Sequence, residues 1–324
     1  MKKRILFAIS VFGLATAVSA EFGVGVGASF NTKVSFESDP ISLPRASNPG
    51  GTGARENHEY DDGYVRVDST GNRFNETTYW GYQNASQYDS AAGTINMHSS
   101  QTSVNASRFS EDDNAASPAV EVYWSKDLKE SERWGVGVRV ALRWQRIEMD
   151  QKSLVGTTRE MTTDSYSLNG SLPPGAPFNG TANGAGYASI GDTPTRTFSS
   201  TAGAAVLSRR SIDANVFALD FGPNIWFDIT DKIRANLSAG GTIAWVRSEF
   251  DYQDGATTGS DRKSDVLLGL YLGGDIQYLL GENWGLFMGA AYTRFEDFEH
   301  DVDGRKATLQ FDDSYTVRTG LFFR

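Results

Sequence analysis

The feature that most limits the fold of this chain is an alternation of apolar residues with small or polar residues at every second position. The clearest example begins at Trp134. One set is Trp134, Val136, Val138, Val140, Leu142 and Trp144, and the other is Gly135, Gly137, Arg139, Ala141, Arg143 and Gln145. Because successive side chains of a β-strand point to opposite faces, this segment predicts a strand with one apolar face.

Eight segments of this kind follow one another along the chain, and turn-forming residues separate them. They occupy residues 22–31, 119–125, 134–145, 217–227, 233–245, 266–278, 284–292 and 314–323. The connections near 126–132, 229–232 and 281–283 are short, whereas those near 32–117, 149–211, 251–263 and 297–306 are longer. Short periplasmic turns and long outer loops are typical of bacterial outer-membrane barrels.

We therefore predict an all-β fold: a transmembrane, antiparallel, up-and-down β-barrel of eight strands with both termini on the periplasmic side. Ten strands are the alternative, if residues 64–68 and 77–81 form an extra hairpin of the wall. The alternation alone also fits a soluble barrel with its apolar face inside. The membrane is favoured by tryptophans near the segment ends, where an aromatic girdle would place them. They are Trp124, Trp134, Trp144, Trp226, Trp245 and Trp284.

The first residues of the chain indicate export. Lys2, Lys3 and Arg4 precede an apolar run at 5–18, and small residues follow up to Ala20. The apolar run is shorter than a membrane-spanning helix needs, which favours a cleaved signal peptide. An uncleaved membrane anchor is the alternative. We predict a signal peptide at 1–20 and a mature chain at 21–324, which forms a single barrel domain in the cell outer membrane.

These strands, their connections and the last segment, Tyr315 to Phe323, resemble the small outer-membrane barrels of the OmpA type and their porin-like relatives. The resemblance covers the strands only. It implies a Gram-negative cell surface, contact with outer-membrane lipid and lipopolysaccharide, and assembly by the barrel-insertion machinery. In that family the last strand usually ends on an aromatic residue, whereas here Arg324 follows Phe323. We expect this difference to weaken the insertion signal and to leave the fold unchanged.

Composition excludes several kinds of chemistry. The chain has no cysteine, which excludes disulfides, thiolate catalysis and cysteine-bound metals. Its 30 Lys and Arg against 40 Asp and Glu make nucleic acid an unsuitable partner. No cofactor motif is present, and we predict no cofactor.

Charged residues of both signs fall on the small and polar face of the predicted strands. They are Glu121, Arg139, Arg143, Asp220, Arg234, Asp275 and Arg318. An eight-stranded barrel is only wide enough for side chains to fill, so we interpret these residues as a paired plug of the lumen. A narrow pore that favours anions is the alternative, because the arginines outnumber the acids.

The first long loop combines aromatic and acidic residues. Its aromatic residues, Tyr64, Tyr79, Trp80, Tyr82 and Tyr88, either bind an extracellular ligand or pack the loop onto itself. Its acidic residues Asp61, Asp62 and Asp68 are a weak calcium candidate, because the spacing of an EF-hand is absent.

Catalytic signals are weak. Glu299, His300 and Asp301 lie in the last long connection, but the sequence specifies no nucleophile near them. We therefore predict that the protein is not an enzyme. The predicted function is that of a structural or porin-like outer-membrane protein, and the alternative is a surface recognition or adhesion protein that uses its long loops.

Overall fold

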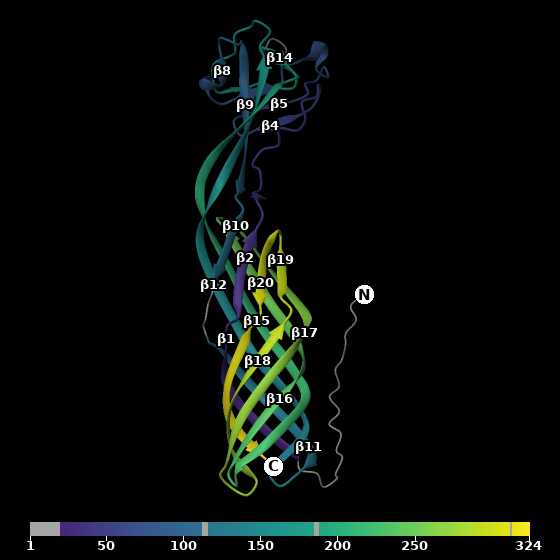
Figure 1. Cartoon of the computed structure of the whole chain (residues 1–324). Coiled ribbons are helices and arrows are strands. Elements are labelled where there is room, and N and C mark those ends of the chain that lie inside the picture. Colours follow the sequence, from purple (N-terminus) through teal and green to yellow (C-terminus); the bar gives the residue numbers. More distant parts are fainter. Residues whose placement is uncertain (1–19, 112–115, 185–187, 312) are drawn as a thin grey trace.

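The computed structural model describes residues 20–111, 116–184, 188–311 and 313–324. The predicted signal peptide, apart from Ala20, lies outside these residues. The described chain is elongated: a ring of strands forms one end, a narrow stalk continues from it, and a small head lies at the other end (Figure 1). None of the helices among the described residues is long and apolar enough to cross a membrane.

Eight strands form the ring, and each covers one of the predicted segments, except that β1 ends one residue before its predicted end. They are β1 (Ala20–Phe30), β11 (Ser117–Glu130), β12 (Trp134–Ser167), β15 (Thr195–Thr230), β16 (Ile233–Asp254), β17 (Thr257–Leu279), β18 (Trp284–Phe295) and β21 (Ser314–Phe323). Neighbours pair antiparallel, and β1 pairs with both β11 and β21, so the ring is closed. The extra hairpin is also present, with Val65 opposite Trp80, but it lies in the head and not in the wall.

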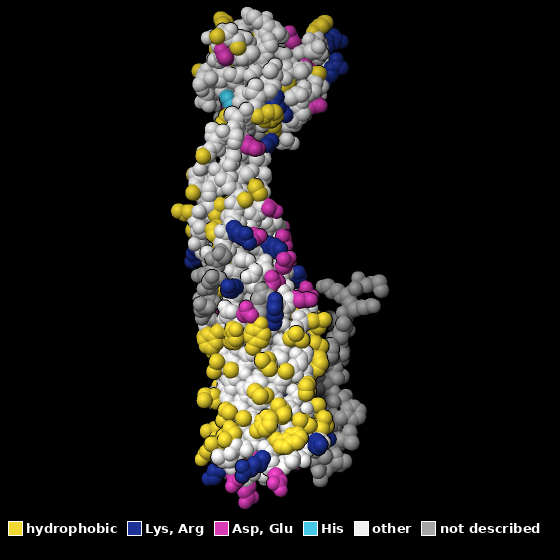
Figure 2. All heavy atoms as spheres, in the orientation of Figure 1, with side chains coloured by type: hydrophobic (Ala, Val, Ile, Leu, Met, Phe, Trp, Pro, Cys, Tyr) yellow, Lys and Arg dark blue, Asp and Glu magenta, His cyan; other side chains and the backbone are white. Residues whose placement is uncertain are grey.

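The outer surface of the ring is apolar and its interior is polar. Leu142, Leu270 and Met288 are exposed on the outside, whereas Glu121 and Arg139 are buried inside. Figure 2 shows exposed apolar side chains as a band across the visible face of the lower part of the molecule. An apolar exterior around a polar interior is the arrangement of a barrel immersed in lipid.

Both ends of the apolar band carry aromatic residues. Trp124, Trp134 and Trp284 are exposed near the short turns, and Trp245 stacks on Phe217 toward the opposite end. The girdle prediction is wrong for one residue. Trp226 is buried inside the ring, because its position in β15 has the parity of the inward-facing residues.

A second sheet fills the outer end of the ring. Its strands are β2 (Lys33–Ser38), β10 (Ser107–Glu111), β19 (Phe298–Val302) and β20 (Arg305–Gln310), in the order β10-β2-β20-β19. Its apolar side chains join inward-facing residues of the ring strands in one core. Members of this core include Phe36, Ile147, Ile212, Val246, Phe250, Phe295, Phe298 and Leu309. The predicted loop at 297–306 is therefore mainly a hairpin that packs over the lumen.

The stalk consists mainly of the continued strands β12 and β15, which pair from the ring up to Ser165 and Thr195. On its other side β12 pairs with β9 (Thr94–Val104), and β9 pairs with β3 (Ile41–Ser42) and β8 (Tyr88–Asp89). The prediction of a loop throughout 149–211 is thus wrong at both ends. Serine and threonine dominate these strands and leave no apolar face, so the alternation could not mark them.

The head contains short elements around its own core. They are β4 (His58–Tyr60), β5 (Gly63–Val65), β6 (Glu76–Thr77), β7 (Trp80–Tyr82), β13 (Phe178–Asn179), β14 (Ile190–Gly191) and the 3-10 helices η1 (Arg73–Asn75) and η2 (Ala85–Gln87). The core consists of Tyr60, Val65, Trp80, Tyr82, Ile95, Met97, Tyr166, Leu168, Phe178 and Ile190.

Candidate functional site

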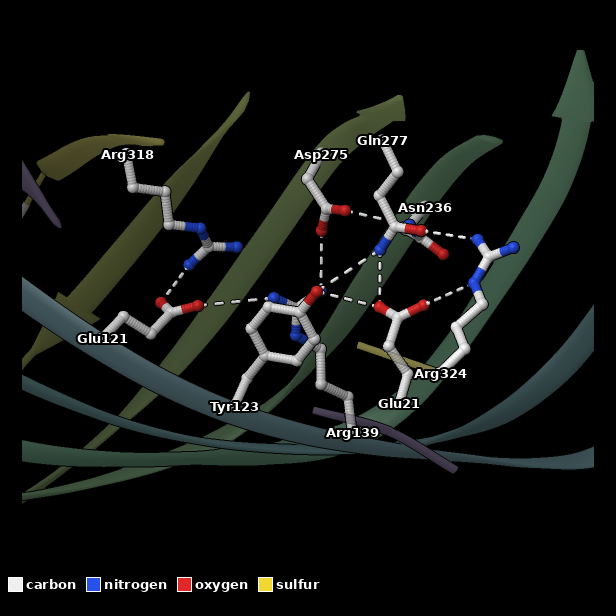
Figure 3. Close-up of polar contacts among 9 residues, drawn as sticks. All are labelled: Glu21, Glu121, Tyr123, Arg139, Asn236, Asp275, Gln277, Arg318 and Arg324. Atoms are coloured by element: carbon white, nitrogen blue, oxygen red, sulfur yellow. Dashed lines mark hydrogen bonds and ion pairs between the residues drawn. The ribbon is translucent and has the colours of Figure 1, made fainter. Parts of the chain in front are cut away.

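Arg139 is the centre of a buried charge network inside the ring (Figure 3). Its Nη1 donates to Oδ2 of Asp275 at 2.6 Å, and its Nη2 lies 3.3 Å from Oε1 of Glu121. The guanidinium also lies over the ring of Tyr123, 3.8 Å from its centroid. Glu121 accepts a second hydrogen bond from Arg318. The structure therefore brings four of the predicted lumen charges into direct contact.

The network extends toward the chain termini through residues that the sequence interpretation did not select. Oε1 of Glu21 accepts hydrogen bonds from the Tyr123 hydroxyl at 2.8 Å and from Nε2 of Gln277 at 2.5 Å. Arg324 donates from Nε to Glu21 and from Nη2 to Gln277. All four lie at inward-facing parity, so the parity rule could have found them.

The other three predicted residues form separate contacts. Arg143 lies 3.7 Å from Asp220 and donates to the hydroxyl of Thr316. Arg234 does not join the central network. It forms a bidentate pair with Asp228 beside the short turn, and its guanidinium stacks on Trp226 at 3.5 Å from the ring centroid.

The lumen is filled at two levels. The charged side chains of the central network are buried and are neutralised by one another. Above them, inward-facing apolar residues pack against the second sheet. A hydrated ion path needs a continuous opening wide enough for water, whereas this arrangement forms a salt-bridged layer under an apolar layer.

The aromatic residues of the first loop divide into buried and half-buried groups. Trp80 and Tyr82 are buried in the head core, where Nε1 of Trp80 donates to the carbonyl oxygen of Ala188. Tyr64, Tyr79 and Tyr88 are half-buried. The Arg66 guanidinium lies 4.8 and 5.4 Å from the ring centroids of Tyr64 and Tyr79, and these two rings also contact each other edge to face. Trp80 and Tyr82 are therefore not available to a ligand.

The structure does not gather the three candidate calcium ligands. Asp61 accepts hydrogen bonds from Ser47 and Ser100, and Asp62 from the backbone and ring of His98. Burial raises the pKa of Asp61, but hydrogen bonds from the Ser100 and Ser47 hydroxyls and from the Ser100 backbone outweigh it and keep the pKa below its ordinary value. Across the described ranges, no group of three or more His, Cys, Asp or Glu could hold a metal ion.

Asp68 instead organises the loop that follows it. Its carboxylate accepts hydrogen bonds from the backbone of Thr70, Asn72 and Thr78, and Asn72 Nδ2 also donates to Asp192. This loop presents Phe74, whose side chain is 93% exposed. Phe74 has a φ of 63°, a conformation that bulky residues rarely adopt. Such strain persists only where the surrounding structure holds it, and it often marks a functional surface.

His300 belongs to a buried polar group and not to an exposed loop tip. Its Nδ1 lies 2.8 Å from the hydroxyl of Ser248, and its Nε2 lies 3.4 Å from Asp261. These are the residue types of a hydrolytic triad. However, Ser248 and His300 are only 1% and 0% exposed, so no substrate could reach the hydroxyl in this conformation.

The ionisation of His300 predicts an acid-sensitive outer sheet. Burial lowers the pKa of His300 below its ordinary value of 6.5, against the opposing effect of Asp261. On acidification, His300 is therefore protonated in the unfolded chain before it is protonated in the folded protein. The stability of the folded protein falls as the pH drops below about 6.5. We expect His300→Gln to reduce the loss of thermal stability between about pH 7.5 and about pH 5.5.

His98→Gln is the matched variant for His300→Gln, because the hydrogen bond between His98 and Asp62 shifts the pKa of His98 in the opposite direction, upward. That pair stabilises the protein at acidic pH and loses its effect as the pH rises through the folded-state pKa. His98→Gln should therefore increase the loss on acidification. Thermal melts of the two variants that shift in the same direction would contradict both assignments.

Comparisons with known proteins identify no family. No protein-family model and no curated protein sequence matches the chain. Several solved structures are similar to it at low scores, and three of them illustrate the range. The outer membrane protease OmpT from Escherichia coli is 10% identical, with a TM-score of 0.35, over 97% of this chain and 99% of that chain. Ail, the attachment invasion locus protein of Yersinia pestis, in complex with the heparin analogue sucrose octasulfate, is 9% identical, with a TM-score of 0.27, over 94% of this chain and 99% of that chain. A Pseudomonas aeruginosa FadL homologue is 6% identical, with a TM-score of 0.18, over 94% of this chain and 90% of that chain. Scores this low do not support the transfer of an activity.

Proposed function

We propose that this protein is a surface recognition protein of the outer membrane, in which a sealed barrel anchors a head that binds an extracellular ligand. The observation that carries the proposal is the filled lumen: a buried salt-bridge network lies below an apolar core. A channel would not need this seal. The porin-like role is correspondingly disfavoured.

The apolar band supports the membrane location. Above the band, the outward-facing side of the ring carries ion pairs between neighbouring strands, including Arg146 with Asp213 and Arg262 with Glu249. These charged residues would lie at the level of lipid and lipopolysaccharide headgroups. In this orientation the short turns and both ends of the mature chain face the periplasm, and the stalk and head project outward.

Conductance in a planar bilayer tests the sealed lumen. We expect the unmodified protein to give no steady current, because buried ion pairs and apolar side chains block the path that ions would need. Brief, irregular openings are compatible with occasional breakage of the network. A steady, anion-selective current would overturn the proposal and support a narrow pore.

Phe74 is the residue that we expect to contact a ligand. The exposed side chains of Arg55 and Arg73 lie on the same part of the head, because Arg55 and the loop that carries Phe74 are both hydrogen-bonded to Asp192. An exposed aromatic ring beside arginines is the composition of many binding hot spots.

The test uses detergent-solubilised protein on arrays of glycans and extracellular matrix proteins. We expect Phe74→Ala to lower binding to the recognised ligand by about tenfold or more, with unchanged thermal stability. Leu172→Ala is the control, since Leu172 is also exposed but lies in another loop of the head. Equal binding by the parent and both variants would exclude this loop as the contact surface.

A further inference from the structure

One edge of the stalk has no strand beside it. Residues 195–206 of β15 pair only with β12, from Thr195 opposite Ser165 to Val206 opposite Val155. The next strand, β16, joins β15 only from Ser208 onward. No other strand in the described part of the chain pairs with residues 195–206. At about 3.3 Å per residue, the open edge is about 40 Å long.

Apart from one register shift, where Gly203 lies opposite Thr157 and Val206 opposite Val155, this edge lacks the features that usually prevent pairing with another chain. Lysine, proline and inward-pointing charges typically protect an exposed strand edge. Residues 195–206 contain neither lysine nor proline. Their only charged side chain, Arg196, is held by Asp164 in a bidentate pair with distances of 2.7 and 2.6 Å. Phe198 is 77% exposed on the same segment.

Two other edges of the protein show the contrast. The opposite side of the stalk is completed by the chain itself, because β9 pairs along β12 from Thr157 to Ser167. On β17, residues 257–268 extend beyond the pairing with β18, which begins at Gly269. That segment carries Asp261, Arg262, Lys263 and Asp265, the kind of charges that discourage strand addition.

We propose that residues 195–206 bind an extended segment of another protein, which adds to the stalk as a further β-strand. The ligand is defined by its chemistry: an uncharged peptide rich in small and β-branched residues, with one apolar side chain against Phe198. Its backbone would supply the hydrogen bonds, as in other cases of strand addition. This inference does not depend on Phe74, and the sealed barrel remains an anchor whether or not it holds.

A second copy of this chain is a poorer occupant. Copies in one membrane stand in the same orientation, so a two-fold axis along the stalk would bring their edges together in parallel, residue against identical residue. In a parallel ladder, a residue whose N–H and C=O point toward the partner strand must lie opposite a residue whose N–H and C=O point away from it. In a two-fold symmetric pair, identical residues lie opposite each other and both point toward the axis, so the hydrogen bonds cannot form.

The test uses the full-length protein in lipid nanodiscs and a fluorescent peptide with the sequence of residues 94–104, which contain no Lys, Arg, Asp or Glu and form the strand that completes the other side of the stalk. We expect this peptide to bind and to slow hydrogen exchange at residues 195–206. Two further peptides carry N-methyl groups on alternate amides, at odd or at even positions. Alternate amides of a strand point to opposite edges, so only one of the two methylated peptides loses the amides that face the stalk. That peptide should bind about tenfold or more weakly, although its side chains are unchanged.

Protein variants locate the site. Thr201→Lys places a charge on the open edge and should weaken peptide binding, whereas Thr258→Lys on the β17 edge should not. No peptide-dependent protection of residues 195–206, or equal binding of all three peptides, would overturn the proposal. Protection of these residues in concentrated protein without peptide, together with dimer formation, would also overturn it and assign the edge to a second copy.

Discussion

Replacing Asp275 with alanine is expected to lower the free energy of unfolding by about 3–5 kcal/mol. Asp275 is buried, accepts a hydrogen bond from Arg139 at 2.6 Å and a second one from Asn236 at 2.9 Å. Its removal leaves the Arg139 guanidinium with one carboxylate partner, Glu121, at the longer distance of 3.3 Å, in a space too narrow for full hydration. Urea titration in liposomes, followed by tryptophan fluorescence, measures the change.

Asp150→Ala is the matched control for this prediction. Asp150 also pairs with an arginine, Arg209, at 2.7 Å, but both side chains are exposed to solvent. An exposed ion pair contributes about 0–1 kcal/mol, so this variant should unfold nearly as the parent does. Equal losses for Asp275→Ala and Asp150→Ala would mean that the lumen is hydrated and that its charges are not a seal.

The second large effect is expected on the outer surface of the ring. Val140 lies in the apolar band, on the outward face of β12 midway between Trp134 and Trp144. Val140→Arg places a cation in the lipid region and should cost about 2–4 kcal/mol. The same urea titration in liposomes measures the loss.

Leu154→Arg provides the control on the same strand. Leu154 also faces outward and is 71% exposed, but it lies above the apolar band, beyond the charged residues Arg146, Glu148 and Asp150. We expect a change within about 0.5 kcal/mol, as for other surface substitutions. A loss at Leu154 as large as that at Val140 would contradict the assignment of the lipid-facing band.

The positions of the ring strands could be predicted from the sequence because each strand must satisfy two environments. Lipid requires apolar residues at every second position, and a narrow lumen requires small or paired polar residues between them. This constraint marks Trp134 to Gln145 clearly, and it places Arg139 inside the ring. It also indicates the contacts of Arg139, since few partners of opposite charge share the lumen.

The sequence by itself did not determine the stalk, the outer sheet or the division of the aromatic residues. Just above the apolar band the alternation is reversed, because Ile147 and Ile212 are buried in an apolar core and the outer face is charged. Farther along, in the stalk, serine and threonine dominate β12 and β15, so the alternation disappears although the strands continue. Phe74 and Trp80 are both aromatic residues among turn-forming neighbours, yet one is exposed and the other buried. Only the packing of Trp80 against Phe178, a residue far along the chain, decides this difference. The open edge of β15 likewise depends on where β16 begins to pair, which is a property of the assembled sheet.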